Sequence, residues 1–306
     1  MHKNKKKEII IITHSGSFHA DDVFACASLS ILLEKKQQLF KIIRTRNEKI
    51  IKTGDFVVDV GGKYDPSKNL FDHHQKEGAD KRKNGILYAS FGLVWKKYGP
   101  EISGNKTVAQ KIDRVLIQPI DAGDNGIAYY KPLFENILPY EFHSIFGVYS
   151  PSWKENIDLD KLFLKMIILA KDIIKREIKK NTDSIEMERI IENIYRNTRD
   201  KRLIIITLPF SRFDIVNTLG KYKKPIYAIY PERGDKDWHI VGINKRPGSY
   251  LTRKPLPKSW AGKTGKALQK ITGIKEAKFC HRARFLAVAN SKEGAIALAR
   301  LSLNKK

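Results

Sequence analysis

A run of four isoleucines, Ile9–Ile12, is followed at once by the polar stretch THSGSFHADD. A short, unbroken apolar run of this kind is typical of a strand buried on both faces, as in a parallel sheet covered by helices. The next segment, DDVFACASLSILLEKK, has helical spacing, and two aspartates near its start suit the positive end of a helix. DFVVDVGG and NLFDHHQ add two more extended segments. This alternation predicts an α/β domain built on a parallel sheet.

The same alternation continues along the chain. SFGLVWKKYG predicts a helix opened by Ser90 and closed by Gly99, and TVAQKIDRVLIQPID predicts one that stops at Pro119 and delivers Asp121 to a loop. Apolar residues recur every three or four positions over 159–178, which predicts a long amphipathic helix, continued by a second one through SIEMERIIENIYRN. After TRDKR, strand and helix patterns resume. We therefore expect an N-terminal α/β domain (1–150), a helical linker segment (151–200) and a smaller α/β C-terminal domain (201–306).

The charge balance of the chain indicates which classes of molecule it can bind. Lys and Arg number 58 against 33 Asp and Glu, a surplus of 25 positive charges. Such a field attracts polyanions, so nucleic acid, nucleotides or phosphorylated small molecules are natural partners, although compositional drift explains the surplus equally well. No apolar run approaches the ~20 residues that cross a bilayer, and the N-terminal apolar run is too short for a secretory signal. We expect a soluble, cytoplasmic protein without membrane contact.

Four clusters of histidines and aspartates follow apolar runs. They are His14, His19 and Asp21; Asp59; Asp72, His73 and His74; and Asp121 and Asp124. Functional groups of a parallel sheet collect at its carboxyl edge. Taken singly, each cluster has an ordinary explanation as a helix cap, a turn residue or a hydrogen-bonded histidine, and propensity favours such roles for Asp22 and Asp124. Four such clusters together favour a shared site.

The types of ligand indicate the metal. The two cysteines, Cys26 and Cys280, offer no paired thiolate site, so a metal must bind through nitrogen and oxygen. Imidazole with several carboxylates suits Mn²⁺, Fe²⁺, Co²⁺ or Zn²⁺. The candidate ligands are more than one ion needs. They predict a pair of metal ions ~3.5–4 Å apart that shares a carboxylate, an arrangement typical of phosphoester hydrolysis.

Several motifs carry a family resemblance. FDHHQ, THSGSFHADD and DVGGKYDP together resemble the DHH phosphoesterase superfamily and, more narrowly, the Myg1 family of metal-dependent hydrolases. DAGDNG, SPSW, PFSRF, RKPLPKSW and HRARFLAVANSKEGAIALAR extend the resemblance over nearly the whole chain. It implies a DHH-like metal-binding catalytic domain in the N-terminal part and a substrate-binding domain in the C-terminal part.

The resemblance also implies residue roles. One ion is expected on His14, His19 and Asp59, and the second on Asp21, Asp59, His73 and Asp121, with Asp59 bridging. His74 is the expected catalytic partner beside Asp59, facing the substrate phosphate as a proton donor or charge stabiliser, while Asp72 and Asp124 are additional candidates. The superfamily commonly has aspartate where this chain has His19, one residue closer to His14. Mn²⁺ is the expected metal, with Mg²⁺, Co²⁺ and Zn²⁺ as alternatives.

The C-terminal part carries candidate substrate contacts. The stretch 239–260 interleaves cations with Tyr250 and Trp260, which is typical either of a groove for single-stranded nucleic acid or of a solvated basic loop with buried rings. By resemblance, the candidate phosphate contacts are Arg253, Lys254, His281, Arg282 and Arg284. The family usually has a glycine-rich stretch after the position of His281, where this chain has Arg282, Arg284 and Ala287.

The resemblance implies a 3′–5′ exonuclease that hydrolyses RNA or short single-stranded oligonucleotides. A small-molecule phosphoesterase, acting on pyrophosphate, a cyclic dinucleotide or a nucleotide, is the first alternative. A non-catalytic, basic RNA-binding protein with a structural metal is the second. The oligomeric state stays open, with a homodimer as one option.

Overall fold

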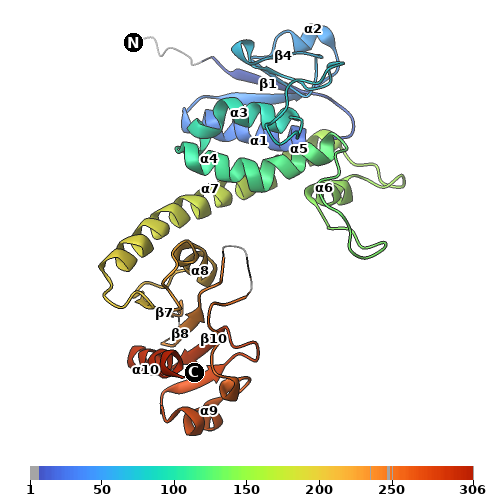
Figure 1. The fold of residues 1–306 in the computed structure, drawn as a ribbon. Coiled ribbons are helices and arrows are strands. Elements are labelled where there is room, and N and C mark those ends of the chain that lie inside the picture. The colour runs from blue at the N-terminus through green and yellow to red at the C-terminus, as the bar shows by residue number, and fades with distance from the viewer. Residues whose placement is uncertain (1–6, 235, 247–248, 250, 306) are drawn as a thin grey trace. The chain divides into compact units, whose positions relative to one another are not determined.

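The computed structural model describes residues 7–234, 236–246, 249 and 251–305. The chain forms two compact units, Met1–Thr182 and Asp183–Lys306. Each unit contains one five-stranded sheet with helices, which confirms the predicted α/β class (Figure 1). Among the described residues, no helix has the length and apolar character needed to cross a membrane.

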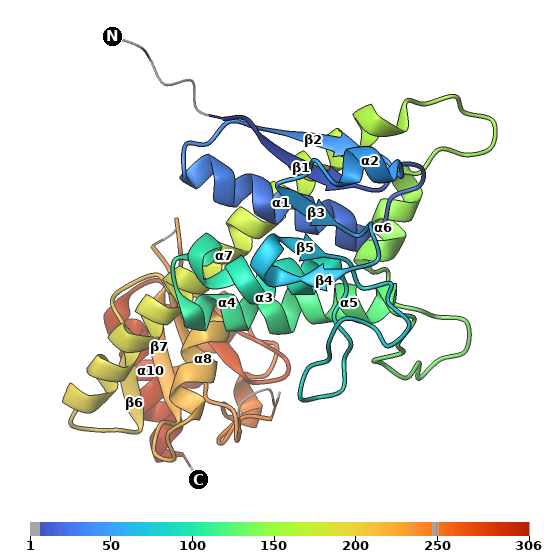
Figure 2. The same cartoon turned by 90° about the horizontal axis from the view of Figure 1, so that it is seen from above.

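The first sheet places its parallel strands side by side. Its order is β2-β1-β3-β5-β4, which Figure 2 shows from above. The strands are β1 (Ile9–Thr13), β2 (Phe40–Arg44), β3 (Phe56–Val58), β4 (Tyr64–Asp65) and β5 (Leu70–Phe71). All neighbouring pairs are parallel except β4 with β5, which is antiparallel. The carboxyl ends of four adjacent strands, β2, β1, β3 and β5, therefore meet at one edge of the sheet.

Helix α1 (Ala20–Lys35) is the central helix of this unit. Its residues are buried from Ala20 to Leu33, so it lacks a polar face, as expected for a helix enclosed on all sides. It packs against β1 and against α3 (Ser90–Ser103). The remaining helices are α2 (Glu48–Ile51), the 3₁₀ turn η1 (Pro66–Lys68), α4 (Lys106–Ile112), the π-helical stretch η2 (Asp113–Ile117), α5 (Gln118–Asp124) and α6 (Phe142–Tyr149).

Helix α3 runs beyond the predicted stop at Gly99. A Cβ atom at Gly99 would lie 2.6 Å from Nε1 of Trp95, so this glycine makes room for a side chain inside the helix. The helix ends at Gly104, whose φ of 71° is the left-handed conformation of a typical C-terminal cap. The pattern identified the helix correctly and assigned the wrong glycine to its end.

The helical region also continues past Pro119, where the sequence predicted a stop. Pro119 stands in the first turn of α5, directly after the π-helical stretch. Proline is tolerated there because its missing N–H group would have no partner in a first turn. Asp121 consequently lies within a helix and not in the predicted loop.

Helix α7 (Leu159–Asn197) is one helix of 39 residues, so the prediction of two successive helices is wrong. Figure 1 shows it running from the first unit into the second. Phe163 and Met166 are buried in the first unit, and Met187 and Ile191 join a core of the second. Its apolar stripe continues over both parts, which explains why one amphipathic helix serves two cores.

The second sheet has the order β6-β7-β8-β10-β9. Its strands are β6 (Leu203–Ile205), β7 (Tyr227–Pro231), β8 (Trp238–Gly242), β9 (Ala277–Cys280) and β10 (Leu286–Ala289), of which only β6 and β7 pair in parallel. The helices are α8 (Arg212–Gly220), the 3₁₀ turn η3 (Lys258–Trp260), α9 (Gly265–Thr272) and α10 (Lys292–Asn304).

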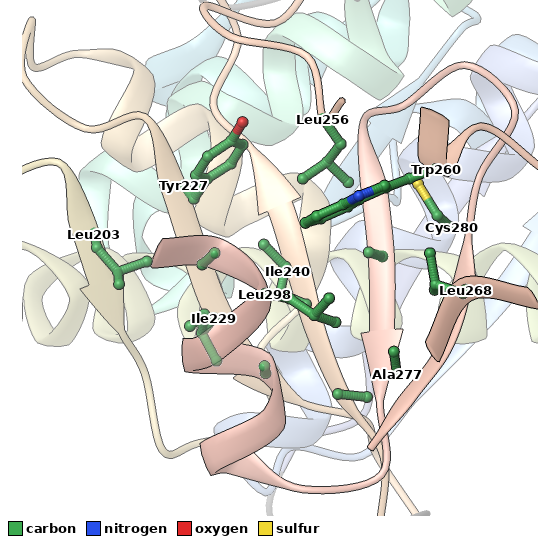
Figure 3. Packing of buried hydrophobic residues seen from close by; sticks show 14 residues of the cluster. Leu203, Tyr227, Ile229, Ile240, Leu256, Trp260, Leu268, Ala277, Cys280 and Leu298 are labelled. Carbon is green, nitrogen blue, oxygen red and sulfur yellow. The ribbon is translucent and has the colours of Figure 1, made fainter. Parts of the chain in front are cut away.

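Trp260 lies in the core of the second unit. Its side chain is fully buried, and Figure 3 shows the ring beside Leu256 and Cys280. A buried ring cannot stack on a nucleobase, so of the two alternatives for the 239–260 stretch, Trp260 fits the buried one. Tyr250, the other ring of that stretch, lies outside the described residues.

Candidate metal centre

The predicted clusters meet at the carboxyl edge of the first sheet. His14 follows β1, Asp59 follows β3, and Asp72, His73 and His74 follow β5. Two helices bring further carboxylates to the same place: Asp21 and Asp22 lie in the first turn of α1, and Asp124 ends α5. Adjacent parallel strands put these side chains together, as expected for this edge.

Asp59 stands between two imidazoles. Its Oδ2 lies 3.3 Å from Nε2 of His14, and its Oδ1 lies 3.2 Å from Nε2 of His73. The backbone holds it there: φ is 55°, in the left-handed region that non-glycine residues seldom adopt, and its N–H donates to the Phe71 carbonyl at 3.1 Å. This conformation turns the chain directly after β3, where the Asp59 carboxylate faces both imidazoles.

Each imidazole also faces a second carboxylate. Nε2 of His14 lies 3.1 Å from Oδ2 of Asp22, and Nε2 of His73 lies 3.1 Å from Oδ2 of Asp124. Asp22 has a structural contact as well, because its Oδ1 accepts the N–H of His19 at 2.9 Å at the start of α1. The helix-start role predicted for Asp22 is thus present, together with a contact to the cluster.

The pKa values of this cluster reflect crowded carboxylates. Burial opposes protonation of His14, but Asp22 and Asp59 outweigh it and raise the pKa of His14 to about 10. The pKa of His73 is likewise about 10, since Asp124 and Asp59 outweigh burial. Without a metal, two imidazolium groups therefore partly neutralise the carboxylates.

Asp21 is buried among like charges, and Nε2 of His73 lies 3.8 Å from its Oδ2. Its side chain has no exposed surface, and neither oxygen accepts a hydrogen bond within the described residues. Burial, then the charges of Asp59 and Asp124, raise its pKa well above the ordinary value. A buried carboxylate without a hydrogen bond is costly unless a cation compensates its charge.

The donor set fits a pair of divalent ions. The two imidazoles face four carboxylates, Asp21, Asp22, Asp59 and Asp124, whose four negative charges equal the charge of two such ions. Three groups of residues each offer ligand atoms that lie within 4.8 Å of one another inside the group. They are His14, His19 and Asp59; Asp59, His73 and His74; and His19, Asp21 and Asp124. Asp59 is shared by the first two groups.

The first group contains the three residues predicted for the first ion. For the second ion, the structure brings Asp21, Asp59 and His73 together, with Asp124 close to His73. Predicted His19 is exposed at the start of α1 and belongs to two groups. The assignment of ligands to ions stays a prediction, and the geometry supplies its candidates.

Asp121 lies in different surroundings from the predicted ones. Its Oδ2 is 2.7 Å from Nη1 of Arg82, and its Oδ1 accepts the N–H of Gly92 at 3.0 Å. A Cβ atom at Gly92 would lie 1.9 Å from Oδ2, so the glycine makes space for the carboxylate. None of the three ligand groups found among the described residues includes Asp121. The geometry therefore favours Asp124 over Asp121 as a ligand.

His74 and Asp72 form a pair at the mouth of the site. Nδ1 of His74 lies 2.8 Å from Oδ1 of Asp72, whose Oδ2 accepts the N–H of Gly62 at 2.6 Å. Asp72 is buried, whereas the His74 side chain is 62% exposed. Both line a pocket of about 590 Å³ together with His14, His19 and Asp59. This volume lies within the range of small-ligand sites, ~300–1,000 Å³.

Two of the candidate phosphate contacts in the second unit hold backbone carbonyls. Nε, Nη1 and Nη2 of Arg253 donate to the carbonyls of Asn244, Pro225 and Gly220. Nζ of Lys254 donates to the carbonyls of Leu303 and Lys305 at the end of α10. Both cations are thus engaged in the scaffold of this unit.

The other three candidates lie between β9 and β10. Arg284 donates to the Leu256 carbonyl and has a φ of 61°. Nδ1 of His281 accepts a hydrogen bond from the Ala283 N–H. The Arg282 side chain is exposed. A pocket of about 770 Å³ is lined by Arg284 with Arg212 and Phe285, among others. Their substrate role stays a prediction.

The contacts of three residues at or near the first site were not predicted from the sequence, where Ser90 was expected only to open a helix. The hydroxyl of Ser90 donates to Oδ1 of Asp59 at 3.0 Å, and Ala89, not Ser90, is the N-cap of α3. Arg82 pairs with Asp121, and Arg46 lines the pocket of the metal ligands. A lone serine or arginine carries no sequence signal, although both arginines lie near recognisable motifs.

Replacing Asp21 by asparagine should stabilise the metal-free protein. Because the folded state raises the pKa of Asp21, its ionisation costs stability above the unfolded pKa of ~3.9, and asparagine removes that cost. We expect a gain of about 1–3 kcal/mol at pH 7 in chelator-treated protein, shrinking toward pH 4, measured by urea unfolding. Added Mn²⁺ should then stabilise wild type more than Asp21→Asn.

Asp55→Asn is the control for this experiment. Burial opposes ionisation of Asp55, but Lys7 and the Ile10 N–H outweigh it and lower its pKa, so the same substitution there should lose stability. A loss of stability in metal-free Asp21→Asn would show that the contacts of Asp21 with His73 and Asp124 outweigh the cost of its burial, which would contradict the electrostatic account.

Asp124→Asn and Asp121→Asn should differ in metal content. Asp124 faces His73, so its loss should lower the number of tightly bound Mn²⁺ ions, measured by elemental analysis after dialysis. Asp121 pairs with Arg82 and belongs to none of the ligand groups found among the described residues, so its loss should leave the metal stoichiometry unchanged. The reverse pattern would restore Asp121 as the ligand.

Comparisons with known proteins agree with the motifs. A family model described as an uncharacterised protein family (UPF0160), MYG1_exonuc, matches residues 10–303. A MYG1 protein of Schizosaccharomyces pombe is 28% identical over 96% of this chain and 97% of its own length. A human protein named MYG1 exonuclease is 26% identical over 96% of this chain and 85% of its own length.

A solved structure of the exonuclease RecJ bound to manganese aligns with 97% of this chain and 91% of its own, at 10% identity and a TM-score of 0.28. A score this low does not by itself establish a common fold. The family model is decisive because it spans nearly all described elements, and it confirms the resemblance seen in the motifs. The chain belongs to the MYG1 (UPF0160) family.

Proposed function

We propose that the protein is a divalent-metal-dependent phosphodiesterase, and that it acts as a 3′–5′ exonuclease on RNA or short single-stranded oligonucleotides. The observation that carries the proposal is the position of Asp59. One buried carboxylate presents its two oxygens to two imidazoles that come from different strands. A carboxylate that bridges two ions is the common feature of two-metal phosphoester hydrolysis.

The chain offers ligands for both ions. His14, His19 and Asp59 would hold one, and Asp21, Asp59, His73 and Asp124 would hold the other. When bound, such a pair supplies an activated water and positive charge for the phosphate oxygens, and Mn²⁺ is the ion we propose. Ser90 fixes Asp59 between the two positions through its hydroxyl.

His74 is suited to handle a proton at the leaving oxygen. Asp72 accepts a hydrogen bond from Nδ1 of His74 and is itself fixed by Gly62, so the ring has a defined orientation. With Nδ1 directed at Asp72, Nε2 is the nitrogen available to the pocket. A ring held in this way can act as a general acid and pass a proton through Nε2 to a leaving group.

The choice of nucleic acid rests on the relatives and on charge. The human and mouse relatives are named MYG1 exonuclease. The surplus of 25 positive charges suits a polyanionic substrate, because the phosphates would release counterions on binding. RNA as the preferred polymer, the 3′–5′ direction and a cytoplasmic location belong to the proposal.

Digestion of 5′-labelled RNA tests the proposal. With saturating Mn²⁺, wild type should produce a ladder of labelled products that shortens with time, because cleavage from the 3′ end keeps the label on the polymer. His74→Ala should retain its metal and lose about 10²–10⁴-fold in rate. Asp59→Asn should lose metal as well as activity. The exposed neighbour Lys76 provides the control: Lys76→Ala should cleave like wild type.

Each other outcome has a defined meaning. Immediate release of labelled mononucleotide would show that cleavage starts at the 5′ end and would contradict the proposed 3′–5′ direction. Hydrolysis of nucleotides or pyrophosphate without action on RNA would identify a small-molecule phosphoesterase. RNA binding that survives in Asp59→Asn, with no hydrolysis by metal-loaded wild type, would identify a non-catalytic binding protein.

A further inference from the structure

Arg46 is a cation at the mouth of the metal-ligand pocket with no assigned role. It follows β2, whose carboxyl end lies beside that of β1, so the sheet brings it to the edge that carries His14. It lines the same 590 Å³ pocket as His19, Asp59 and His74. Four adjacent parallel strands thus contribute to one pocket, and the segment after β2 contributes the one arginine or lysine in its lining among the described residues.

The guanidinium of Arg46 has defined contacts on one side. Its Nε donates to the Ser15 carbonyl at 3.2 Å, and its Nη2 lies 3.3 Å from Nδ1 of His14. Within the described residues, Arg46 forms no ion pair with a carboxylate. The contact with Ser15 therefore anchors the group and leaves its charge without a partner of opposite sign.

Arg44, two residues earlier, shows the contrasting case. Its side chain is almost completely buried, donates to the Gly16 carbonyl and pairs with Asp160 at 2.7 Å. Its guanidinium also lies 4.6 Å from the centre of the Phe163 ring. Arg44 has the contacts of a structural arginine, whereas Arg46 is exposed and unpaired.

The contact of Arg46 with His14 cannot be a strong hydrogen bond when Nε2 of His14 binds an ion. A neutral imidazole that ligates through Nε2 carries its proton on Nδ1, and the Ser15 carbonyl, 3.3 Å away, is the acceptor for that proton. A protonated Nδ1 cannot accept from Nη2 of Arg46. The outer N–H groups of the guanidinium then remain free for an incoming anion.

We propose that Arg46 is a substrate-binding residue that donates to a non-bridging oxygen of the phosphate group held at the metal ligands. The inference rests on the proposed phosphodiesterase function and assigns the phosphate subsite to the first unit. A guanidinium presents several N–H groups in a plane and matches phosphate geometry, which suits this task better than a point charge. Anchoring through Ser15 keeps it oriented before substrate arrives.

Binding of adenosine 5′-monophosphate to the Mn²⁺-loaded protein tests the proposal without relying on turnover. Titration calorimetry should show Arg46→Ala binding it about 10–100-fold more weakly than wild type, with Arg46→Lys in between. Adenosine, which lacks the phosphate, should bind all three proteins equally. Lys49→Ala, on exposed α2 nearby, should match wild type.

A purely structural role for Arg46 makes different predictions. If Arg46 only braced Ser15 and His14, Arg46→Ala would lose Mn²⁺, measured by elemental analysis, and its metal-saturated form would bind the nucleotide like wild type. Either equal nucleotide affinity or equal loss of adenosine binding would overturn the proposal. Failure of wild type to bind the nucleotide would also overturn it.

This experiment separates the two proposals. If wild type binds the nucleotide through Arg46 but leaves RNA intact, the exonuclease proposal fails and the phosphate subsite stands. If RNA is cleaved and Arg46→Ala binds the nucleotide normally, the subsite fails and the exonuclease proposal stands.

Discussion

The placement of the Asp59 carboxylate between His14 and His73 is the contact on which the rest of the site depends. It requires β1, β3 and β5 to be adjacent and parallel, so that residues following each strand meet. It also requires a left-handed backbone at Asp59, held by the hydrogen bond to Phe71. The buried strands of the first unit therefore do more than form a core: their order fixes the distance between two imidazoles.

Buried carboxylates are neutralised in two ways in this unit. Asp121 meets Arg82, and burial nevertheless raises its pKa to about 7, which shows how poorly the interior tolerates a carboxylate even beside a cation. Among the described residues, Asp21 meets only the imidazole of His73, whose Nε2 lies 3.8 Å from its Oδ2 and which Asp59 and Asp124 also contact. The protein thus pairs one carboxylate with its own guanidinium and gathers the others around two imidazoles, where three groups of possible metal ligands meet. That difference separates a structural aspartate from a ligand.

Much of the first unit could be predicted from sequence, because unbroken apolar runs such as Ile9–Ile12 identify buried strands and the polar residues after them identify the edge. The errors came from residues whose role depends on tertiary context. Pro119 suggests a helix stop but lies in the first turn of a helix after a π-helical stretch. The sequence therefore favoured Asp121 as a metal ligand, whereas the structure favours Asp124. Strand β2, which leads to Arg46, has a mixed sequence, FKIIR, and a half-buried pattern. Arg253 resembles a phosphate contact in sequence, and only the structure shows three carbonyls around it.

The central claim is that Asp59 bridges two metal ions, and anomalous diffraction from crystals soaked in Mn²⁺ measures this directly. The account predicts two manganese peaks ~3.5–4 Å apart, one beside His14 and one beside His73, with an oxygen of Asp59 bound to each. A single peak, or two peaks of which only one contacts Asp59, would contradict it.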